Sequence, residues 1–349
     1  MSLGSVNVRD VAALAGVSVG TVSNALNSPD KLAQATLDRV RQAIRELGFV
    51  RNESARQLRA GSSRTLGLVV LDVTNPFFTD VARGVEDSAN ESGIAVFLCN
   101  TDERAEKEAN YLRLLEEQRV QGILITPVEV VSEGLKELRH RGMPIVLLDS
   151  RATDADQCSV SVDDVLGGDL ALSHLLQMGH RRICFVGGPF TYKQVQDRFE
   201  GATRAIDSSG FEVEFTTLVT PGLNVAAGLA AGAQLVDATP RPTAVFCAND
   251  LVALGVLQAV VKHGLRVPQD LAIVGYDDIE FAGAASHPLS SVRQPRQLLG
   301  RTAAQLLIEE STSPDTHLHE RVTFEPELVV RISSSHKMRP RRGRATTPA

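Results

Sequence analysis

Apolar residues in the first 50 positions recur at helical spacing in three short segments. Asn7 is a good cap for the first segment, which Gly16 ends, and Ser18 is a good cap for the second. The third segment ends at Gly48, and its apolar stripe consists of Leu37, Val40, Ile44 and Leu47. Three short helices with a tight turn after the first predict a helix-turn-helix unit over residues 1–50.

The pattern changes at Thr65, where short apolar runs begin to alternate with amphipathic segments of helical period. The apolar runs predict strands within 66–73, 94–100, 122–128, 144–150, 183–188, 212–220, 244–250 and 271–278. The segments between them predict helices over 77–92, 103–118, 132–141, 165–178, 192–209, 224–238 and 251–262. Short apolar strands between helices are typical of parallel sheets covered on both faces. Because the alternation restarts near Asp163, we expect an α/β body with two similar lobes.

Two stretches fit neither pattern. Residues 51–64 are polar and basic and end in Gly-Ser-Ser-Arg, which predicts a linker that holds one marginal helix. Residues 335–349 form a basic tail without apolar periodicity, which we expect to be disordered. The predicted fold is therefore an N-terminal all-α head, a linker and an α/β body over 65–334.

The composition narrows the class of protein. Of 349 residues, 43% are hydrophobic and 22% charged, so we expect a soluble globular chain with a large core. No apolar stretch approaches the roughly 20 residues of a membrane span, and Asp10 interrupts the start before an export signal can form. The cysteines are far apart, which predicts reduced thiols in the cytoplasm and neither disulfides nor a zinc site. They are Cys99, Cys158, Cys184 and Cys247.

Charge is divided unevenly along the chain. The net charge is −6 overall, but residues 1–64 carry +4, residues 65–330 carry −16 and residues 331–349 carry +6. A basic head on an acidic body lets the head face a polyanion while the body stays soluble. An accidental asymmetry of a solvated surface is the alternative, and charge alone does not separate the two.

The second predicted helix carries side chains suited to reading DNA. A recognition helix places short side chains of its first turns against base edges in the major groove. Asn24 can pair with adenine, Thr21 and Ser23 can hold phosphates, and Val19, next to Gly20, can touch a thymine methyl group. A three-helix bundle that binds protein is the alternative, but the turn, the helix lengths and the basic excess together favour DNA.

Motifs for catalysis or metal binding are weak. Residues 16–20 match the G-x-S-x-G nucleophile elbow, but that elbow needs a strand before it, and the preceding segment is periodic as a helix. Ser18 is therefore predicted to be a helix cap. His317 and His319 stand in a polar stretch and are predicted to be solvated. We expect no catalytic residues, no metal and no cofactor.

Polar residues follow the predicted strands of the body. Because ligands in this architecture bind at the carboxyl ends of parallel strands, these residues mark a candidate ligand edge. They are Asn75, Asp102, Thr126, Asp149, Asn249 and Asp277. Asn75 and Asp102 also suit helix capping, and Asp277 also suits a turn, so these alternatives stay open.

Taken together, the motifs resemble the lactose-repressor (LacI-type) family of transcription regulators from about Asn7 to Ile332. The motifs that carry the resemblance are VNVRDVAALAGVSVGTVSNALN, GFVRNESARQL, TLGLVV followed by NPFF, RFEGA, CANDLVALGVLQA, GYDDIEFA and SSVRQP. The resemblance implies a body like that of periplasmic sugar-binding proteins. Its first lobe would comprise about 65–162 with 292–321, and its second lobe about 163–291 with 322–334.

The resemblance also implies how such a chain meets DNA. A homodimer binds a palindromic operator, and the family's base-reading positions fall on Val19, Gly20 and Asn24. The linker becomes a hinge helix on DNA, with Asn52 in it, Leu58 as a wedge in the minor groove and Ala55 small enough for two hinge helices to approach. A linker residue without a special role is the alternative for Leu58.

By the same resemblance, an effector binds in the cleft between the lobes. The implied contacts are Phe77, Phe78, Asp149, Arg198, Asn249 and Asp277, with Asn75 and Gln294 nearby. Carboxylates, amides and a guanidinium suit sugar hydroxyls, and an aromatic ring suits the apolar face of a sugar. Two positions depart from the family pattern: Leu223 stands where an aromatic residue is frequent, and Ala33 stands where a Ser or Thr cap is usual.

These observations predict a DNA-binding transcriptional regulator, a repressor, whose operator affinity is controlled by a small effector, a mono- or disaccharide. A solute-binding protein without a DNA role is the alternative, which the basic head and the missing export signal disfavour. The tail has no leucine heptads, so we expect a dimer without a tetramerising coiled coil.

Overall fold

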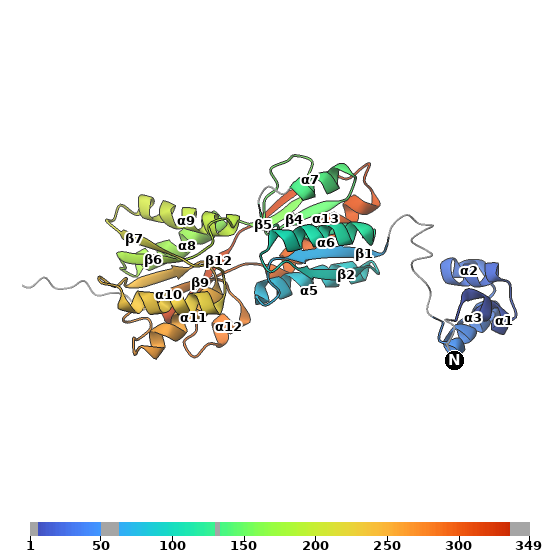
Figure 1. Cartoon of the computed structure of the whole chain (residues 1–349), viewed down its shortest axis with the longest axis horizontal. Helices are drawn as coiled ribbons and strands as arrows, with labels where there is room; N and C mark the ends of the chain where they lie inside the picture. Colours follow the sequence, from blue (N-terminus) through green and yellow to red (C-terminus); the bar gives the residue numbers. More distant parts are fainter. Residues whose placement is uncertain (1–5, 50–62, 130–132, 336–349) are drawn as a thin grey trace, which may run out of the picture. The chain divides into compact units, whose positions relative to one another are not determined.

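The computed structural model describes residues 6–49, 63–129 and 133–335 (Figure 1). The chain divides between Ser63 and Arg64 into two compact units, a helical head and an α/β body. The predicted contacts Asn52, Ala55 and Leu58, and the tail from residue 336 onward, lie outside the described residues.

The head consists of helices, as the apolar spacing predicts. Its elements are α1 (Val8–Ala15), α2 (Val19–Asn27), the 3-10 turn η1 (Pro29–Lys31) and α3 (Gln34–Leu47). Asn7 caps α1 by accepting a hydrogen bond from the Arg9 N–H at 2.8 Å, and Ser18 caps α2 by accepting one from the Thr21 N–H at 3.1 Å. Gly16 adopts the left-handed conformation that ends α1 and turns the chain into α2. The head core is made of Val11, Ala12, Ala15, Val22, Val40 and Ala43.

The first lobe of the body has a parallel sheet in the order β11-β5-β4-β3-β1-β2. Its strands are β1 (Thr65–Val70), β2 (Ala95–Asn100), β3 (Gly122–Ile125), β4 (Ile145–Leu148), β5 (Ser159–Val162) and β11 (Arg321–Phe324). Its helices are α5 (Pro76–Glu91), α6 (Ala105–Glu117), α7 (Glu133–His140) and α13 (Arg296–Thr312). Helices α5 and α13 share one buried core with the sheet, and α6 and α7 share the other, so both sheet faces are covered.

The second lobe repeats this arrangement with the order β12-β10-β9-β8-β6-β7. Its strands are β6 (Arg182–Gly187), β7 (Glu214–Val219), β8 (Ala244–Cys247), β9 (Ala272–Asp277), β10 (Ser290–Arg293) and β12 (Glu327–Val329). Its helices are α8 (Asp164–Gln177), α9 (Lys193–Ser209), α10 (Val225–Asp237), α11 (Asp250–Lys262), α12 (Glu280–Ala284) and η2 (Ile332–Ser334). The pairs α8–α9 and α10–α11 belong to separate cores. Strand β12 runs antiparallel to β10, a departure from the expected parallel pairing.

The chain crosses between the lobes three times, and the second and third crossings lie a few residues after the approximate boundaries predicted from the sequence. The first lies between β5 and α8, where the pattern restarts. The boundaries predicted at 291/292 and 321/322 fall inside strands: β10 runs to Arg293 in the second sheet, and β11 runs to Phe324 in the first. The sequence pattern also missed α13, whose polar and apolar positions are weakly segregated although six of its residues are buried.

Helices α8 and α9 touch backbone to backbone through two glycines. A Cβ atom on Gly168 would lie 2.0 Å from the carbonyl oxygen of Arg198, and one on Gly201 would lie 1.9 Å from the carbonyl oxygen of Val165. No larger residue fits at this distance, so the two helices pack as a rigid pair. The side chain of Arg198 therefore leaves α9 from a fixed position.

Candidate functional site

A narrow cleft lies at the carboxyl ends of the strands, between the two lobes. The first lobe contributes Leu71, Asp72, Asn75, Phe77, Phe78, Glu103 and Asp149, and the second contributes Tyr192, Gln194, Arg198, Leu223, Asn249 and Asp277. The volume of the cleft is about 40 Å³, far below the roughly 300–1,000 Å³ of ordinary small-molecule sites. The lobes must therefore part, or side chains must move, before a ligand of sugar size can enter.

The structure brings the predicted effector residues together. Seven of the eight line the cleft: Asn75, Phe77, Phe78, Asp149, Arg198, Asn249 and Asp277. The eighth, Gln294, is buried behind it and donates its amide to Asp277 Oδ1 at 2.8 Å. Among the other strand-end candidates, Asp102 is exposed and pairs with Arg104 and Lys107. Thr126 is fully buried and does not line the cleft.

Strand ends and helix caps place the cleft residues of the first lobe. Asn75 accepts a hydrogen bond from the Phe77 N–H at 3.0 Å and so caps α5, with Pro76 in the first turn. The rings of Phe77 and Phe78 are buried and pack edge to face, with centroids 5.0 Å apart. Asn75 thus caps a helix and also lines the cleft, so the two roles that the sequence left open for it are both filled.

A buried network holds Arg198 in the second lobe. Its Nε donates to Asp164 Oδ1 at 2.8 Å, and its Nη1 donates to the carbonyl oxygen of Ala248 at 2.7 Å. The guanidinium also lies 3.7 Å from the ring centroid of Tyr276. Asp277 Oδ1 is 3.8 Å from Nη1, which is an ion pair and not a close hydrogen bond. Two of the five N–H donors of Arg198 are therefore taken up by the protein, and its charge is paired with Asp164.

The cleft gathers more carboxyl groups than cations. Burial raises the pKa of Asp149 well above its usual range, and nearby Asp164 adds to the rise while Arg198 opposes it. Burial likewise raises the pKa of Asp277 to about 6, although Arg198 and Gln294 favour the charged form. The second carboxylate oxygen of Asp149, Oδ1, is buried and has no hydrogen-bond partner among the described residues. An acceptor of this kind is expected to find a partner, such as a ligand hydroxyl group.

Acidic residues at the cleft also have unusual backbone conformations. Glu103, Asp149 and Asp277 have backbone φ angles of 59°, 53° and 101°. Residues other than glycine rarely adopt positive φ angles of this kind. Strain of this kind costs on the order of 1–3 kcal/mol per residue and is typical of binding sites. The turns after the strands thus aim these carboxyl groups at the cleft despite the conformational cost.

The sequence pattern did not predict three hydrogen bonds across the cleft, one donated by Tyr192 and two by Gln194. The hydroxyl group of Tyr192 donates to Glu103 Oε2 at 2.9 Å. The amide of Gln194 donates to the carbonyl oxygen of Asp149 at 2.7 Å and to its Oδ2 at 3.1 Å. Each bond joins the two lobes. Glu103 directly follows a candidate position, Asp102, whereas Tyr192 and Gln194 lie at the start of a helix and carry no local signal.

The predicted DNA-reading residues lie at the start of α2. Val19, Gly20 and Asn24 are exposed, while Val22 between them is fully buried and anchors the helix to the head core. Thr21 is half-buried, and its hydroxyl group pairs with that of Ser18 at 2.9 Å. Ser23 is also half-buried and accepts a hydrogen bond from the side chain of Asn27. The predicted base-reading residues therefore share an exposed face.

The structure confirms that Ser18 caps a helix and is not a nucleophile. Helix α1, and not a strand, precedes it, and its hydroxyl oxygen accepts from the Thr21 N–H. The prediction that both histidines are solvated is confirmed for His319, which is exposed, and is wrong for His317. His317 is half-buried, and the two imidazoles lie 3.2 Å and 3.6 Å from the Sγ atom of Cys158, a residue 159 and 161 positions away. No local pattern reveals a contact over that separation.

Within the described residues, no helix has both the length and the apolar character needed to cross a lipid bilayer. The geometry thus defines a class: a helix-turn-helix head joined in one chain to a two-lobed ligand-binding body. Comparison with known proteins agrees with this class. The family model "Bacterial regulatory proteins, lacI family" matches residues 7–52, and the model "Periplasmic binding protein-like domain" matches residues 172–334.

Relatives with known names cover nearly the whole chain. The ribose operon repressor of Escherichia coli (strain K12) is 36% identical, over 94% of this chain and 99% of its own. The HTH-type transcriptional repressor PurR of Vibrio atlanticus (strain LGP32) is 35% identical, over 93% of this chain and 97% of its own.

Two solved structures share the fold. A LacI-family regulator from Enterococcus faecium with bound ribose is 30% identical over 79% of this chain and all of its own, with a TM-score of 0.72. The lac repressor dimer bound to operator and the anti-inducer ONPF is 26% identical over 94% of this chain and 99% of its own, with a TM-score of 0.83. The chain belongs to the lacI family of bacterial regulatory proteins. This confirms the predicted fold and the predicted function, a DNA-binding transcriptional regulator controlled by a small effector.

Proposed function

We propose that this protein is a repressor whose affinity for a palindromic operator is controlled by an unphosphorylated sugar, a mono- or disaccharide, in the cleft between the lobes. The observation that carries the proposal is the lining of the cleft, which combines buried carboxyl groups, amides and aromatic rings. A solute-binding protein without a DNA role is disfavoured, because the same chain carries a head of the lacI family.

The cleft chemistry suits a ligand with several hydroxyl groups. Asp149 and Asp277 can each accept two hydrogen bonds, and the amides of Asn75 and Asn249 can donate as well as accept. The paired rings of Phe77 and Phe78 offer an apolar wall, although Leu223, which also lines the cleft, provides no aromatic face. The ribose operon repressor and the ribose-bound regulator among the relatives support a pentose as the first sugar to test.

The charge balance supports a ligand without a phosphate group. Asp72, Glu103, Asp149 and Asp277 line the cleft, and Arg198 is the one cation among the described residues that line it. Arg198 already pairs with Asp164 at 2.8 Å. A phosphate would meet several carboxyl groups, and the described lining residues offer only a cation that is already paired, which costs several kcal/mol in a buried site.

The hydrogen bonds that Tyr192 and Gln194 donate across the cleft supply a coupling mechanism. A sugar hydroxyl group that donates a hydrogen bond to Asp149 would displace the side-chain amide of Gln194 from it. The loss of this bond between the lobes would change the relative stability of the lobe orientations. An effector biases DNA affinity by its differential affinity for those orientations, with a coupling free energy of about 1–3 kcal/mol. We propose that the sugar favours the lobe orientation that has the lower affinity for operator DNA.

We propose that Val19, Gly20 and Asn24 face base edges and that Thr21 and Ser23 contact phosphates. The exposure of the first three supports this assignment, as does their place in the first turns of a helix after a tight turn. The hinge contacts Asn52, Ala55 and Leu58 remain predictions from the sequence.

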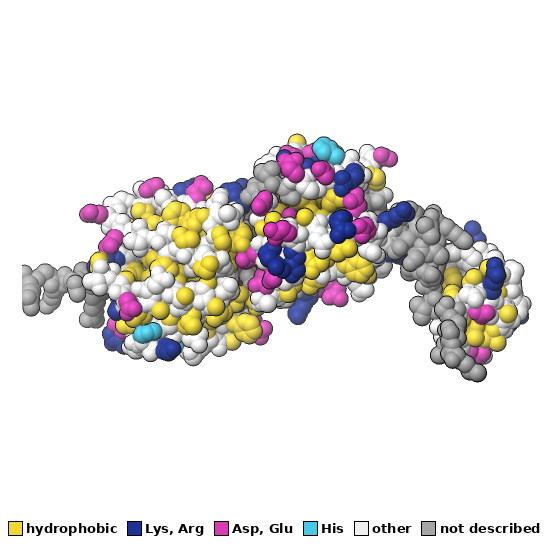
Figure 2. Space-filling view, in the orientation of Figure 1, with side chains coloured by type: hydrophobic (Ala, Val, Ile, Leu, Met, Phe, Trp, Pro, Cys, Tyr) yellow, Lys and Arg dark blue, Asp and Glu magenta, His cyan; other side chains and the backbone are white. Residues whose placement is uncertain are grey.

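A homodimer is supported by exposed apolar residues on both lobes. Strands β2 and β7 are equivalent edge strands of the two sheets, and α6 and α10 follow them in the chain. Figure 2 shows apolar side chains gathered over both lobes on the face that carries α6 and α10. The exposed ones on these elements are Phe97, Leu98, Leu114, Val219, Val225 and Leu229. An exposed apolar surface of this kind is typical of an interface between subunits.

We further propose that the protein acts in the cytoplasm, where its DNA lies, and acts by binding without catalysis. The named relatives, which are repressors, support this assignment.

Calorimetry with the full-length protein tests the effector class. Ribose, other pentoses, hexoses and disaccharides are compared with ribose 5-phosphate. We expect one unphosphorylated sugar to bind, and Asp149→Asn to weaken it at least tenfold, since the variant replaces one of the two carboxyl oxygens by an amide group that cannot accept a hydrogen bond. Asp102→Asn is the matched control, because Asp102 also follows a strand but lies outside the cleft, and it should change affinity less than twofold. Tighter binding of the phosphorylated sugar, or equal effects of the two variants, would refute the proposal.

A further inference from the structure

Four side chains with metal-ligating atoms meet in the first lobe, at the end of the sheet opposite to the cleft. Cys158 immediately precedes β5, Glu310 lies in the last turns of α13, and His317 and His319 lie between α13 and β11. The parallel pairing of Ser159 with Arg321 brings these segments side by side. The cluster lies at the amino ends of the strands, whereas the cleft lies at their carboxyl ends.

The ligating atoms are already close to coordination distances. The Sγ atom of Cys158 is 3.2 Å from His317 Nε2 and 3.6 Å from His319 Nδ1. In a tetrahedral zinc site, with bonds of about 2.0–2.3 Å, neighbouring ligand atoms lie about 3.3–3.8 Å apart. All four ligating atoms, including a carboxylate oxygen of Glu310, lie within 4.8 Å of one another. Movements of about 1 Å would complete a tetrahedral set.

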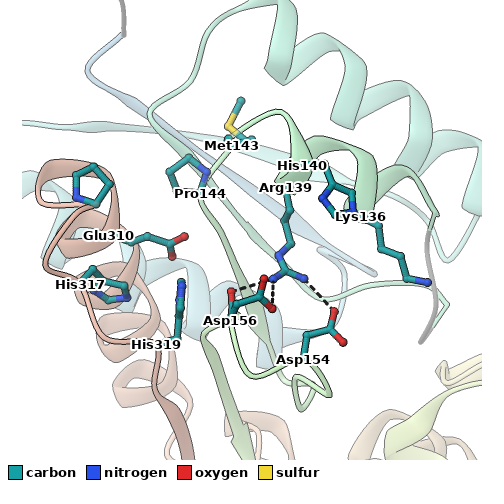
Figure 3. Close-up of a pocket in the computed structure, with 12 residues that line it drawn as sticks. Lys136, Arg139, His140, Met143, Pro144, Asp154, Asp156, Glu310, His317 and His319 are labelled. Carbon is teal, nitrogen blue, oxygen red and sulfur yellow. Dashed lines mark hydrogen bonds and ion pairs between the residues drawn. The ribbon is translucent and has the colours of Figure 1, made fainter.

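The surroundings of the cluster suit a bound cation. Glu310 Oε2 is buried, and no described residue offers it a hydrogen bond. The Sγ atom of Cys158 accepts a hydrogen bond from the Glu320 N–H at 3.3 Å, a contact that favours a thiolate ligand. Figure 3 shows Glu310, His317 and His319 turned toward a common space. The orientation of these side chains and the buried Glu310 oxygen, which has no hydrogen-bond partner among the described residues, thus indicate the same position for a cation.

The neighbouring cation, Arg139, is neutralised by the protein. Its guanidinium pairs with Asp154 at 3.1 Å and with Asp156 at 2.8 Å, as the dashed lines in Figure 3 mark. Asp156 also lies near His319 and interacts with its charge. The acidic side chains of Asp154 and Asp156 thus offset the positive charge of Arg139 beside the cluster.

We propose that Cys158, Glu310, His317 and His319 bind one Zn²⁺ ion. One thiolate, two imidazoles and one carboxylate are the donors that zinc prefers, and four protein ligands are typical of a structural site. The ion would fasten the segment between α13 and β11 to the start of β5. An adjoining cavity of about 330 Å³, lined by Glu310, His317 and His319, provides a path for entry.

Cobalt binding to the untagged full-length protein, kept reduced, tests the proposal. Co²⁺ replaces Zn²⁺ in such sites, and a cysteine ligand adds a thiolate-to-cobalt charge-transfer band in the near ultraviolet. We expect one Co²⁺ per chain with this band, displacement by Zn²⁺, and loss of the band in Cys158→Ser. His319→Gln should weaken Co²⁺ binding at least tenfold, since one ligand is removed.

His140→Gln is the matched control, because His140 lines the same cavity but is not in the cluster. It should change cobalt affinity less than twofold. Since Cys158 is fully buried and its variant can misfold, His319→Gln, at an exposed residue, keeps the test decisive, with circular dichroism to verify folding. The proposal is overturned if the native protein gives no thiolate band, or if His319→Gln and His140→Gln have equal effects.

Discussion

Asp277→Asn should make the stability of the body less dependent on pH. Burial raises the pKa of Asp277 to about 6 in the folded protein, against about 3.9 in an unfolded chain. Because the folded state keeps a proton that the unfolded state releases, the native protein loses stability as pH rises from about 4 to about 6. Asparagine does not ionise, so the variant escapes this loss.

The size of the effect follows from the difference between the two pKa values. Two pKa units correspond to about 3 kcal/mol in the free energy of unfolding. The free energy of unfolding of Asp277→Asn minus that of the native protein should therefore rise by about 2 kcal/mol between pH 4 and pH 7, because part of the change already occurs below pH 4. Any hydrogen bond lost on substitution, such as that from Gln294, changes this difference equally at every pH.

Urea unfolding at a series of pH values measures the difference. The chain has no Trp, so circular dichroism is the appropriate signal. Asp207→Asn, on the exposed side of α9, controls for the loss of one carboxyl group. A difference that stays constant within about 0.5 kcal/mol from pH 4 to pH 7, or that grows toward low pH, would show that Asp277 is not held in a desolvated site.

Three further predictions concern the head, the helix packing and the DNA contact. Ala33→Ser should stabilise the start of α3 by about 1 kcal/mol, because Ala33 offers no side-chain cap; amide exchange there should slow about fivefold, and unchanged exchange would contradict this. Gly168→Ala should lower the stability of the body by about 1–3 kcal/mol by overpacking. Gly283→Ala, where the nearest atom would be 3.7 Å away, should have little effect in the same urea assay, and similar losses would contradict the packing argument. Leu58→Ala should weaken specific DNA binding much more than non-specific binding in mobility-shift assays. Equal losses of affinity for specific and non-specific DNA would contradict the role of Leu58 as a wedge in the minor groove.

Much of the fold follows from local chemistry. The caps Asn7 and Ser18 and the stop at Gly16 suffice to place the first two helices, because capping depends on neighbours in sequence. The alternation after Thr65 predicts two lobes, since parallel strands need covering helices. That topology brings the strand-end residues Asp149 and Asp277 to one cleft, although they are far apart in the chain.

What the sequence could not predict depends on distant contacts. The hydrogen bonds from Tyr192 and Gln194 across the cleft depend on how close the lobes stand, and that distance has no local signature. The meeting of Cys158 with His317 depends on the register of β5 with β11, which pairs segments more than 150 residues apart. Helix α13 was missed because its buried side chains do not form a narrow stripe.

Operator binding measured by fluorescence anisotropy, with and without the sugar that calorimetry identifies, tests the central claim most directly. The operator is selected from a random palindromic library, and the sugar is held at a saturating concentration. We predict that the sugar raises the Kd for operator by about 5–150-fold, the range that corresponds to 1–3 kcal/mol of coupling. Asp149→Asn, measured at the same sugar concentration, should show a much smaller change. An operator Kd that is the same with a full and a vacant cleft would contradict the account.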